Sequence, residues 1–149
     1  METENLARCL AVKCPTNAVV YLSGDLGTGK STFARAFLQS LGVTGSIKSP
    51  TYTLMETYAL ENGIEAIHMD MYRIFDPDEI NFLGLDSFAS NVQVILIEWP
   101  EKGMESLPAA DLIIQLDHHG QNRRIALRAS TDAGLAWLTS AQIGFLNAS

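Results

Sequence analysis

Gly24-Asp25-Leu26-Gly27-Thr28-Gly29-Lys30-Ser31 follows the Walker A pattern, in which a glycine and four free positions are followed by Gly-Lys and then Ser or Thr. Closely spaced glycines let backbone N–H groups converge on phosphate without obstruction by a Cβ atom. In this pattern the lysine contacts the β and γ phosphates, and the hydroxyl is a magnesium ligand. The segment therefore predicts a nucleotide site, with Lys30 on phosphate and Ser31 on magnesium.

The residues around this segment predict a strand before it and a helix after it. Residues 18–22 form a short, apolar, β-branched run, as buried parallel strands do. Residues 30–41 carry apolar side chains at helical spacing, and Gly42 ends the pattern. The positive end of such a helix points at the bound phosphate. Strand, glycine loop and helix in this order are typical of a P-loop NTPase.

The whole pattern predicts an α/β fold with a mostly parallel central sheet flanked by helices, and with a β-hairpin and antiparallel strands at one edge. The 149 residues, 47% of them hydrophobic, suffice for one buried core, so a single P-loop ATPase domain is expected over residues 1–149. The other expected elements are a helix over 3–13, a hairpin of 51–58 and 64–70, a helix from Asp76-Pro77, strands over 92–97, 111–116 and 124–129, and a short helix over 133–139.

Charge and composition limit the possible partners. The net charge of −7 argues against extensive direct contact with nucleic acid, which draws most of its affinity from Lys and Arg. No apolar run reaches the roughly 18 residues that a membrane span needs, and the acidic start lacks the basic region of a signal peptide. We therefore expect a cytoplasmic protein without a membrane partner, and reduced thiols at Cys9 and Cys14.

Hydrolysis also requires an acid near the magnesium ion or the attacking water. Glu98 ends the apolar run 94–97, as the acid of a Walker B strand does, and is the first candidate. Asp70 ends a weaker strand, and capping of the following turn is nearly as good an interpretation of it. Thr51 follows the P-loop helix, where switch proteins place a hydroxyl that senses γ-phosphate. His68 is interpreted as a packed or hydrogen-bonded histidine rather than a ligand.

Four ordered motifs, which together span most of the chain, resemble those of the TsaE family, bacterial ATPases that assist threonylcarbamoyladenosine modification of tRNA. They are Gly24 to Phe33, Ser49-Pro50-Thr51-Tyr52-Thr53-Leu54, His68-Met69-Asp70-Met71-Tyr72-Arg73 and Glu98-Trp99-Pro100. The resemblance implies ATP and Mg²⁺ as cofactors. It implies Ser31 and Glu98 around magnesium, with Thr51 and Asp70 supporting hydrolysis. The residues expected at the nucleotide are Gly24, Asp25, Gly27, Thr28, Gly29, Lys30, Ser31, Thr32 and Arg123, the last near its outer side.

The resemblance also implies protein partners and a role. TsaE proteins act with TsaB and TsaD, and TsaD transfers the threonylcarbamoyl group to an adenosine next to the anticodon. ATP hydrolysis by this chain would reset that complex between turnovers, slowly alone and faster with the partners, and tRNA would reach it only through them. Two departures from the family pattern, Thr28 for alanine and Ser31 for threonine, remove no phosphate or metal contact.

Two other functions are compatible with a short P-loop domain. A small-molecule kinase would need arginines over the phosphates, a role open to Arg73, Arg123 and Arg124, but no arginine-rich lid insert is evident. A GTP-dependent switch would normally carry Asn-Lys-x-Asp to read guanine, and that sequence is absent. The order of motifs favours the tRNA-modification ATPase.

Overall fold

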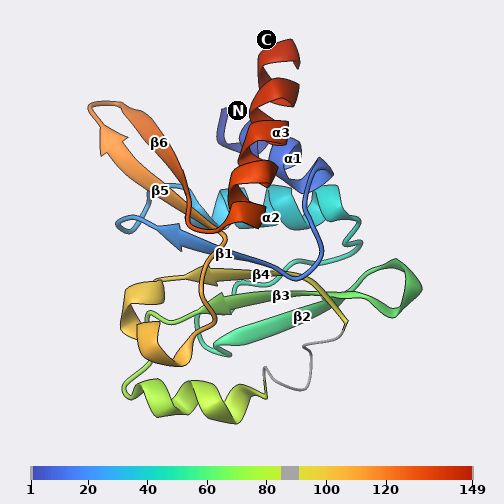
Figure 1. Ribbon diagram of the computed structural model, residues 1–149. Coiled ribbons are helices and arrows are strands. Elements are labelled where there is room, and N and C mark those ends of the chain that lie inside the picture. Colours follow the sequence, from blue (N-terminus) through green and yellow to red (C-terminus); the bar gives the residue numbers. More distant parts are fainter. Residues whose placement is uncertain (1, 85–90, 149) are drawn as a thin grey trace.

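The computed structural model describes residues 2–84 and 91–148. In this part of the chain, strand β1 (Ala18–Ser23) lies inside a six-stranded sheet, whose strand order is β2-β3-β4-β1-β5-β6 (Figure 1). The strands β3 (Glu65–Asp70), β4 (Val92–Glu98), β1 and β5 (Leu112–His119) run parallel. The hairpin partner β2 (Met55–Ala59) is antiparallel to β3 at one edge, and β6 (Asn122–Ala129) is antiparallel to β5 at the other. The predicted α/β fold is confirmed.

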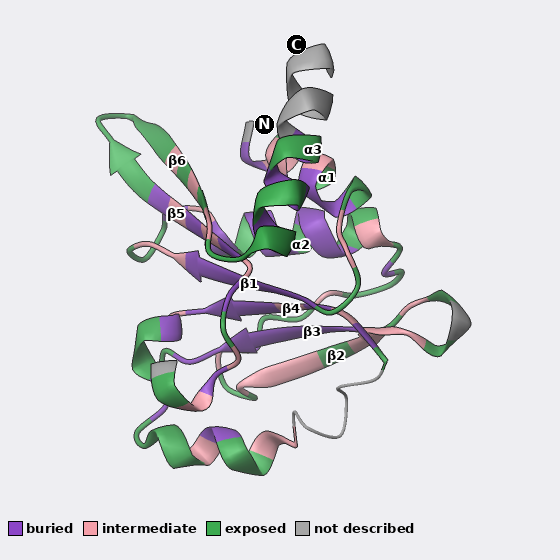
Figure 2. Ribbon diagram, in the orientation of Figure 1, coloured by how far each residue is buried: buried purple, intermediate pink, exposed green. Residues whose placement is uncertain are grey.

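Three helices lie together against one face of the sheet, namely α1 (Glu2–Val12), α2 (Lys30–Leu41) and α3 (Asp132–Ala148) (Figure 1). Phe33, Phe37 and Leu38 of α2 are fully buried in the core cluster on that face. The opposite face is covered by short 3-10 helices, η2 (Pro77–Leu83), η4 (Pro100–Lys102) and η5 (Met104–Ser106). Burial is therefore greatest in the central strands and falls toward β6, as Figure 2 shows.

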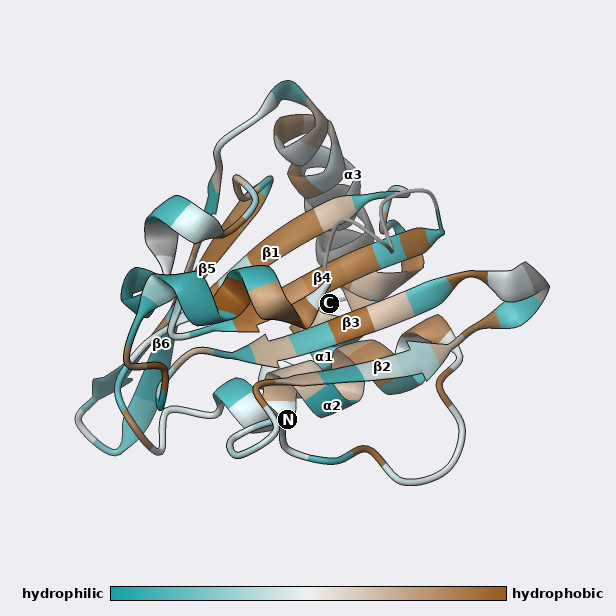
Figure 3. Ribbon diagram, turned by 90° about the horizontal axis from the view of Figure 1, so that it is seen from below, coloured by the Kyte–Doolittle hydropathy of each residue, from teal (hydrophilic) through white to brown (hydrophobic). Residues whose placement is uncertain are grey.

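Polar side chains are concentrated at the β6 edge of the sheet. Figure 3 shows apolar residues concentrated on the central strands, while β6 is largely hydrophilic. On β6 the side chains of Arg123, Arg124 and Arg128 are exposed, as solvated charges of an edge strand are expected to be. None of the helices in the described part of the chain is both long and apolar enough to span a membrane.

Three predicted elements differ in extent or form. The helix from Asp76 is a 3-10 helix, although it starts as predicted, with the Asp76 carboxylate accepting from the Asp78 N–H at 3.0 Å. The closing helix is longer than predicted, because α3 continues to Ala148. Residues 51–54 form a turn rather than the start of a strand, since the Leu54 N–H bonds to the Pro50 carbonyl at 2.8 Å. That turn directs Thr51 toward the cleft described next.

Candidate active site

A cleft of about 540 Å³ lies where the parallel strands β1, β3 and β4 end. Parallel strands bring their carboxyl ends to one edge of the sheet, where ligands of open α/β sheets bind. The predicted site residues that line it are Gly27, Gly29, Lys30, Ser31, Thr32, Thr51, Asp70, Glu98 and Arg123. The cleft thus brings together residues predicted from five separate parts of the sequence.

The glycine loop turns sharply between β1 and α2. Gly24 has φ +141°, and a Cβ atom there would lie 2.1 Å from the Leu116 carbonyl oxygen of β5. Gly29 has φ +103° and directly precedes α2, and a Cβ atom there would lie 3.0 Å from a guanidinium nitrogen of Arg123. At Gly24 both conformation and space exclude a side chain, and at Gly29 the left-handed conformation favours glycine. The loop therefore packs its backbone closely between β5 and Arg123.

The first turn of α2 is arranged to bind an anion. No described side chain forms a hydrogen bond that caps this helix end at Gly29. Backbone N–H groups of a first turn carry partial positive charge and need an acceptor. Arg123 adds a formal positive charge beside them and lines the same cleft. A phosphate group would satisfy the N–H groups and pair with the guanidinium.

Lys30 is buried, with 6% exposure, and points back over the loop that carries it. Its ammonium group donates to the Gly24 carbonyl and lies 3.6 Å from the centroid of the Trp99 ring. Burial lowers the pKa of Lys30, while the nearby carboxylates of Glu98 and Asp70 oppose that shift. A buried ammonium held by a carbonyl and an aromatic face gains strongly from an anion, so it is poised to pair with phosphate.

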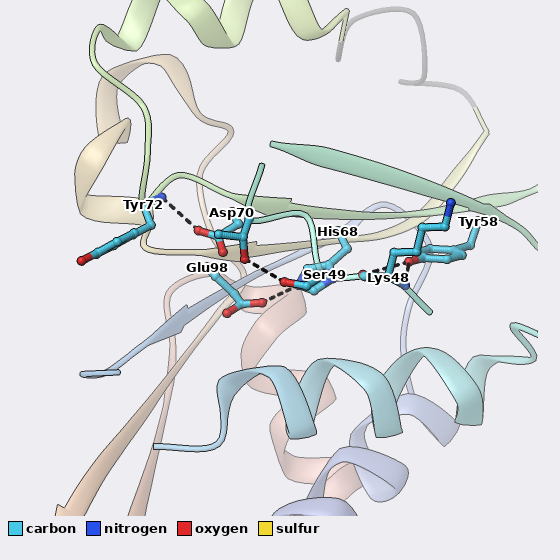
Figure 4. A network of polar contacts seen from close by, with 8 residues as sticks. Lys48, Ser49, Tyr58, His68, Asp70, Tyr72 and Glu98 are labelled. Carbon is cyan, nitrogen blue, oxygen red and sulfur yellow. Dashed lines mark hydrogen bonds and ion pairs between the residues drawn. The ribbon is translucent and has the colours of Figure 1, made fainter. Parts of the chain in front are cut away.

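Two acids end neighbouring strands at the floor of the cleft. Glu98 of β4 and Asp70 of β3 are register partners, and their exposures are 3% and 6%. The Asp70 carboxylate accepts from the Tyr72 N–H at 2.9 Å (Figure 4). Burial raises the pKa of Asp70, and the negative charge of Glu98 adds to that shift. Two adjacent buried carboxylates favour a cation between them and the phosphates.

The residues present fit a magnesium ion bound together with a nucleotide. Ser31 and Glu98 line the same cleft and offer a hydroxyl and a carboxylate oxygen. Among residues 2–84 and 91–148, no three His, Cys, Asp or Glu side chains converge as a complete metal cage. Magnesium is commonly held by one or two protein oxygens with phosphate oxygens and water, so a partial donor set of this kind suits it.

The turn that carries Thr51 is anchored at its base. The Tyr58 hydroxyl of β2 accepts from the Lys48 N–H at 2.9 Å and donates to the Lys48 carbonyl at 3.2 Å (Figure 4). The hydroxyl groups of Ser49 and Thr51 lie 2.8 Å apart. The anchor holds the turn against the hairpin while Thr51 reaches the cleft.

Three predicted nucleotide residues lie beside the cleft rather than in its lining. The Thr28 hydroxyl donates to the Asp25 carbonyl at 2.8 Å, and Thr28 is 1% exposed, so its side chain shapes the loop. Gly24 and Asp25 line a smaller cavity of about 280 Å³ on the other side of Trp99. Any phosphate contact from Thr28 would come from its backbone N–H.

Four residues of the cleft lining were not among the predicted site residues, namely Leu26, Tyr72, Arg73 and Trp99, although Arg73 was considered for the kinase alternative. The rings of Tyr72 and Trp99 have centroids 4.8 Å apart, and the Arg73 guanidinium lies 4.5 Å from the centroid of Tyr52. A signal for Tyr72, Arg73 and Trp99 exists in the sequence, because Trp99 directly follows Glu98, and Tyr72 and Arg73 follow Asp70 after Met71. Together they form an aromatic and basic wall beside Lys30.

Trp99 is expected to report nucleotide binding through its fluorescence. Phosphates that draw the Lys30 ammonium away would change the environment of the indole ring above it. Titration with ADP should therefore give a saturable change in tryptophan emission. The other tryptophan, Trp137, is a matched control, because it is buried and donates to the Leu10 carbonyl at 2.9 Å. Trp137→Phe should keep the change and Trp99→Phe should abolish it, whereas the opposite pattern would contradict the site.

Comparison with known protein families gives one match over most of the chain. Residues 1–126 match the family described as threonylcarbamoyl adenosine biosynthesis protein TsaE. A Haemophilus influenzae protein named tRNA threonylcarbamoyladenosine biosynthesis protein TsaE is 45% identical over 116 residues, which are 78% of this chain and 73% of that protein. A Bacillus subtilis protein of the same name is 37% identical over 123 residues, 83% of this chain and 76% of that protein.

A solved structure shows the same architecture. The crystal structure of YdiB from Bacillus subtilis superposes with a TM-score of 0.79 and 28% sequence identity. The match covers 96% of this chain and 88% of the other, so it includes the sheet, the glycine loop and the covering helices.

Proposed function

The chain belongs to the TsaE family, which takes part in tRNA threonylcarbamoyladenosine biosynthesis, and on this premise we propose that it is a magnesium-dependent ATPase. One observation carries the proposal. The buried ammonium of Lys30, next to the uncapped end of α2, faces the buried carboxylates of Glu98 and Asp70 across one cleft. Positive groups for phosphate and acids for a metal and a water are the two requirements of phosphoryl transfer.

The proposed mechanism assigns each group a role that its position supports. The N–H groups of the glycine loop, with Lys30 and Arg123, bind the phosphates and hold them in line for attack. Ser31 and Glu98 would hold magnesium, which when bound neutralises charge on the β and γ phosphate oxygens. Asp70 and Thr51 lie on the cleft wall and are proposed to orient the attacking water. Trp99 and Tyr72 line the cleft with their rings 4.8 Å apart, and we propose that they limit the access of bulk water to the bound nucleotide.

We further propose that hydrolysis serves the protein complex of TsaB and TsaD rather than tRNA directly. The net charge of −7 disfavours unaided capture of tRNA, so RNA would reach this chain through its partners. The turn around Thr51 lies at the cleft mouth, where contact with a partner protein would complete the site. Hydrolysis would then reset the complex between rounds of adenosine modification.

The expected result is slow ATP hydrolysis by this protein alone and faster hydrolysis with its partners. Steady-state ATPase is measured with the protein alone, with TsaB and TsaD, and with tRNA added, beside a multiple-turnover assay of modified adenosine. Omission of this protein should stop modification after the first turnovers. Equal ATPase rates throughout, with undiminished modification in its absence, would contradict the proposal. Phosphate transfer to a small acceptor instead of water would favour the kinase alternative.

A further inference from the structure

A buried histidine contacts the acid that ends β4. His68 Nε2 lies 2.6 Å from Glu98 Oε2, and both residues are 3% exposed (Figure 4). The two residues lie on neighbouring parallel strands, but His68 is the register partner of Leu96, two positions before Glu98. The Glu98 side chain therefore reaches back along the sheet to meet the ring.

This contact engages only one oxygen of Glu98. Oε2 is bound by His68, and no described group makes a hydrogen bond to Oε1. Glu98 nevertheless lines the cleft beside Lys30 and Ser31. The hydrogen bond thus fixes the carboxylate at one oxygen and leaves the other for a ligand in the cleft.

The histidine ring is not well explained as a packing residue. Its Nδ1 atom is buried and has no hydrogen-bond partner among the described residues. A buried polar atom without a partner destabilises a fold, and an apolar side chain would fill the same space without that disadvantage. Sites of function are where such local disadvantages are expected to persist.

We propose that His68 is a positioning residue, whose Nε2–H holds the Glu98 carboxylate in the orientation that magnesium–nucleotide binding requires. The inference rests on the proposed function. A carboxylate can only accept, so the short contact assigns a proton to Nε2, while Nδ1 has no hydrogen-bond partner among the described residues. Partners that orient ligating groups in this way typically change metal affinity about 10- to 100-fold when they are removed.

Two substitutions separate the hydrogen bond from the volume of the ring. His68→Gln retains an N–H donor at the position of Nε2, whereas His68→Met fills similar space without a donor. Affinity for a non-hydrolysable ATP analogue is measured by calorimetry, once with magnesium and once with EDTA. With magnesium, His68→Met should bind about 10- to 100-fold more weakly than the parent, and His68→Gln should recover most of the loss. With EDTA the three proteins should bind alike.

The same variants in a Glu98→Ala background, which has no side-chain oxygen for His68 to hold, show whether His68 acts through Glu98. There His68→Met should cause no further loss of magnesium-dependent affinity. An additional loss of the same size, or equal affinities for His68→Met and the parent with magnesium, would overturn the positioning role. Thermal unfolding of each variant identifies any that do not fold.

A measurement on the unaltered protein keeps the proposal testable even if His68→Met does not fold. Nitrogen NMR of the histidine rings reports which ring nitrogen carries a proton, and His68→Gln identifies the signal of His68. A proton on Nε2 is expected, and an unprotonated Nε2 would overturn the proposal. Absence of ATP hydrolysis by the unaltered protein and its partners would instead contradict the proposed function, while calorimetry and NMR would still decide the role of His68.

Discussion

Replacing Lys30 by alanine is expected to weaken magnesium–ATP binding by about 30-fold or more. Truncating one partner of a desolvated charge pair costs about 2–5 kcal/mol, and each 1.4 kcal/mol is a factor of ten in affinity. Lys30 is 6% exposed and supplies the buried positive charge nearest the glycine loop. Calorimetric titration with magnesium and ATP measures the loss.

The fold of Lys30→Ala should survive, because burial already lowers the pKa of this ammonium and its removal relieves a desolvated charge. Thermal unfolding checks this point. Lys13→Ala is a matched control, since Lys13 is exposed near the end of α1 and should bind ATP like the parent. Parent-like affinity in Lys30→Ala would leave the glycine loop without a role in binding the nucleotide.

Much of the fold follows from local pattern. The strand, glycine loop and helix around residues 18–41 were predicted because apolar β-branched runs and helical spacing are strong signals over short distances. The turn at 51–54 was missed because one hydrogen bond from Leu54 to Pro50 decides it. The form of the helix at Asp76 was also missed, since cap and proline signals mark where a helix begins but do not distinguish 3-10 from α.

The sequence predicted which residues at the strand ends belong to the candidate site, but it did not predict the contacts between their side chains. Lys30 and Ser31 were expected near Asp70 and Glu98, because the first two belong to the Walker A segment and the two acids end predicted strands. Alternation along β3 places His68 on the same face as Asp70, so the sequence suggests that it lies near the site. It does not show that the side chain of Glu98 reaches back two positions to meet it, because that depends on rotamers and on the register of β3 and β4.

The position of Trp99 illustrates the same limit. The sequence places it one residue after Glu98, where a packed tryptophan and a site residue look alike. In the structure its backbone has φ +55°, which turns the chain sharply, and its ring covers the Lys30 ammonium. The indole thus packs against the core and lines the cleft at once, and the sequence pattern carries little information on the left-handed backbone conformation found there.

Glu98→Gln is expected to retain nucleotide binding but to lose most ATP hydrolysis. It is therefore the sharpest test of the separate roles proposed for Glu98 and Asp70. The amide retains the shape of the carboxylate, and its oxygen can still accept from His68, so the fold and ATP affinity should change only a few-fold. Loss of one charge aimed at the transition state typically lowers kcat by about 10²- to 10³-fold. Glu105→Gln, at an exposed acid in η5, should hydrolyse ATP like the parent.

Single-turnover hydrolysis and calorimetry of Glu98→Gln measure the rate of the chemical step and the nucleotide affinity separately. A lower rate at nearly unchanged affinity would show that the charge of Glu98 acts in the chemical step. Hydrolysis at the parent rate would instead make Asp70 the principal acid. Asp70 is the register partner of Glu98 and lines the same cleft, so Asp70→Asn would then carry the large loss. If Glu98 acts as proposed, Asp70→Asn should cause the smaller loss, because Glu98 is proposed to hold the magnesium ion and Asp70 only to orient the attacking water.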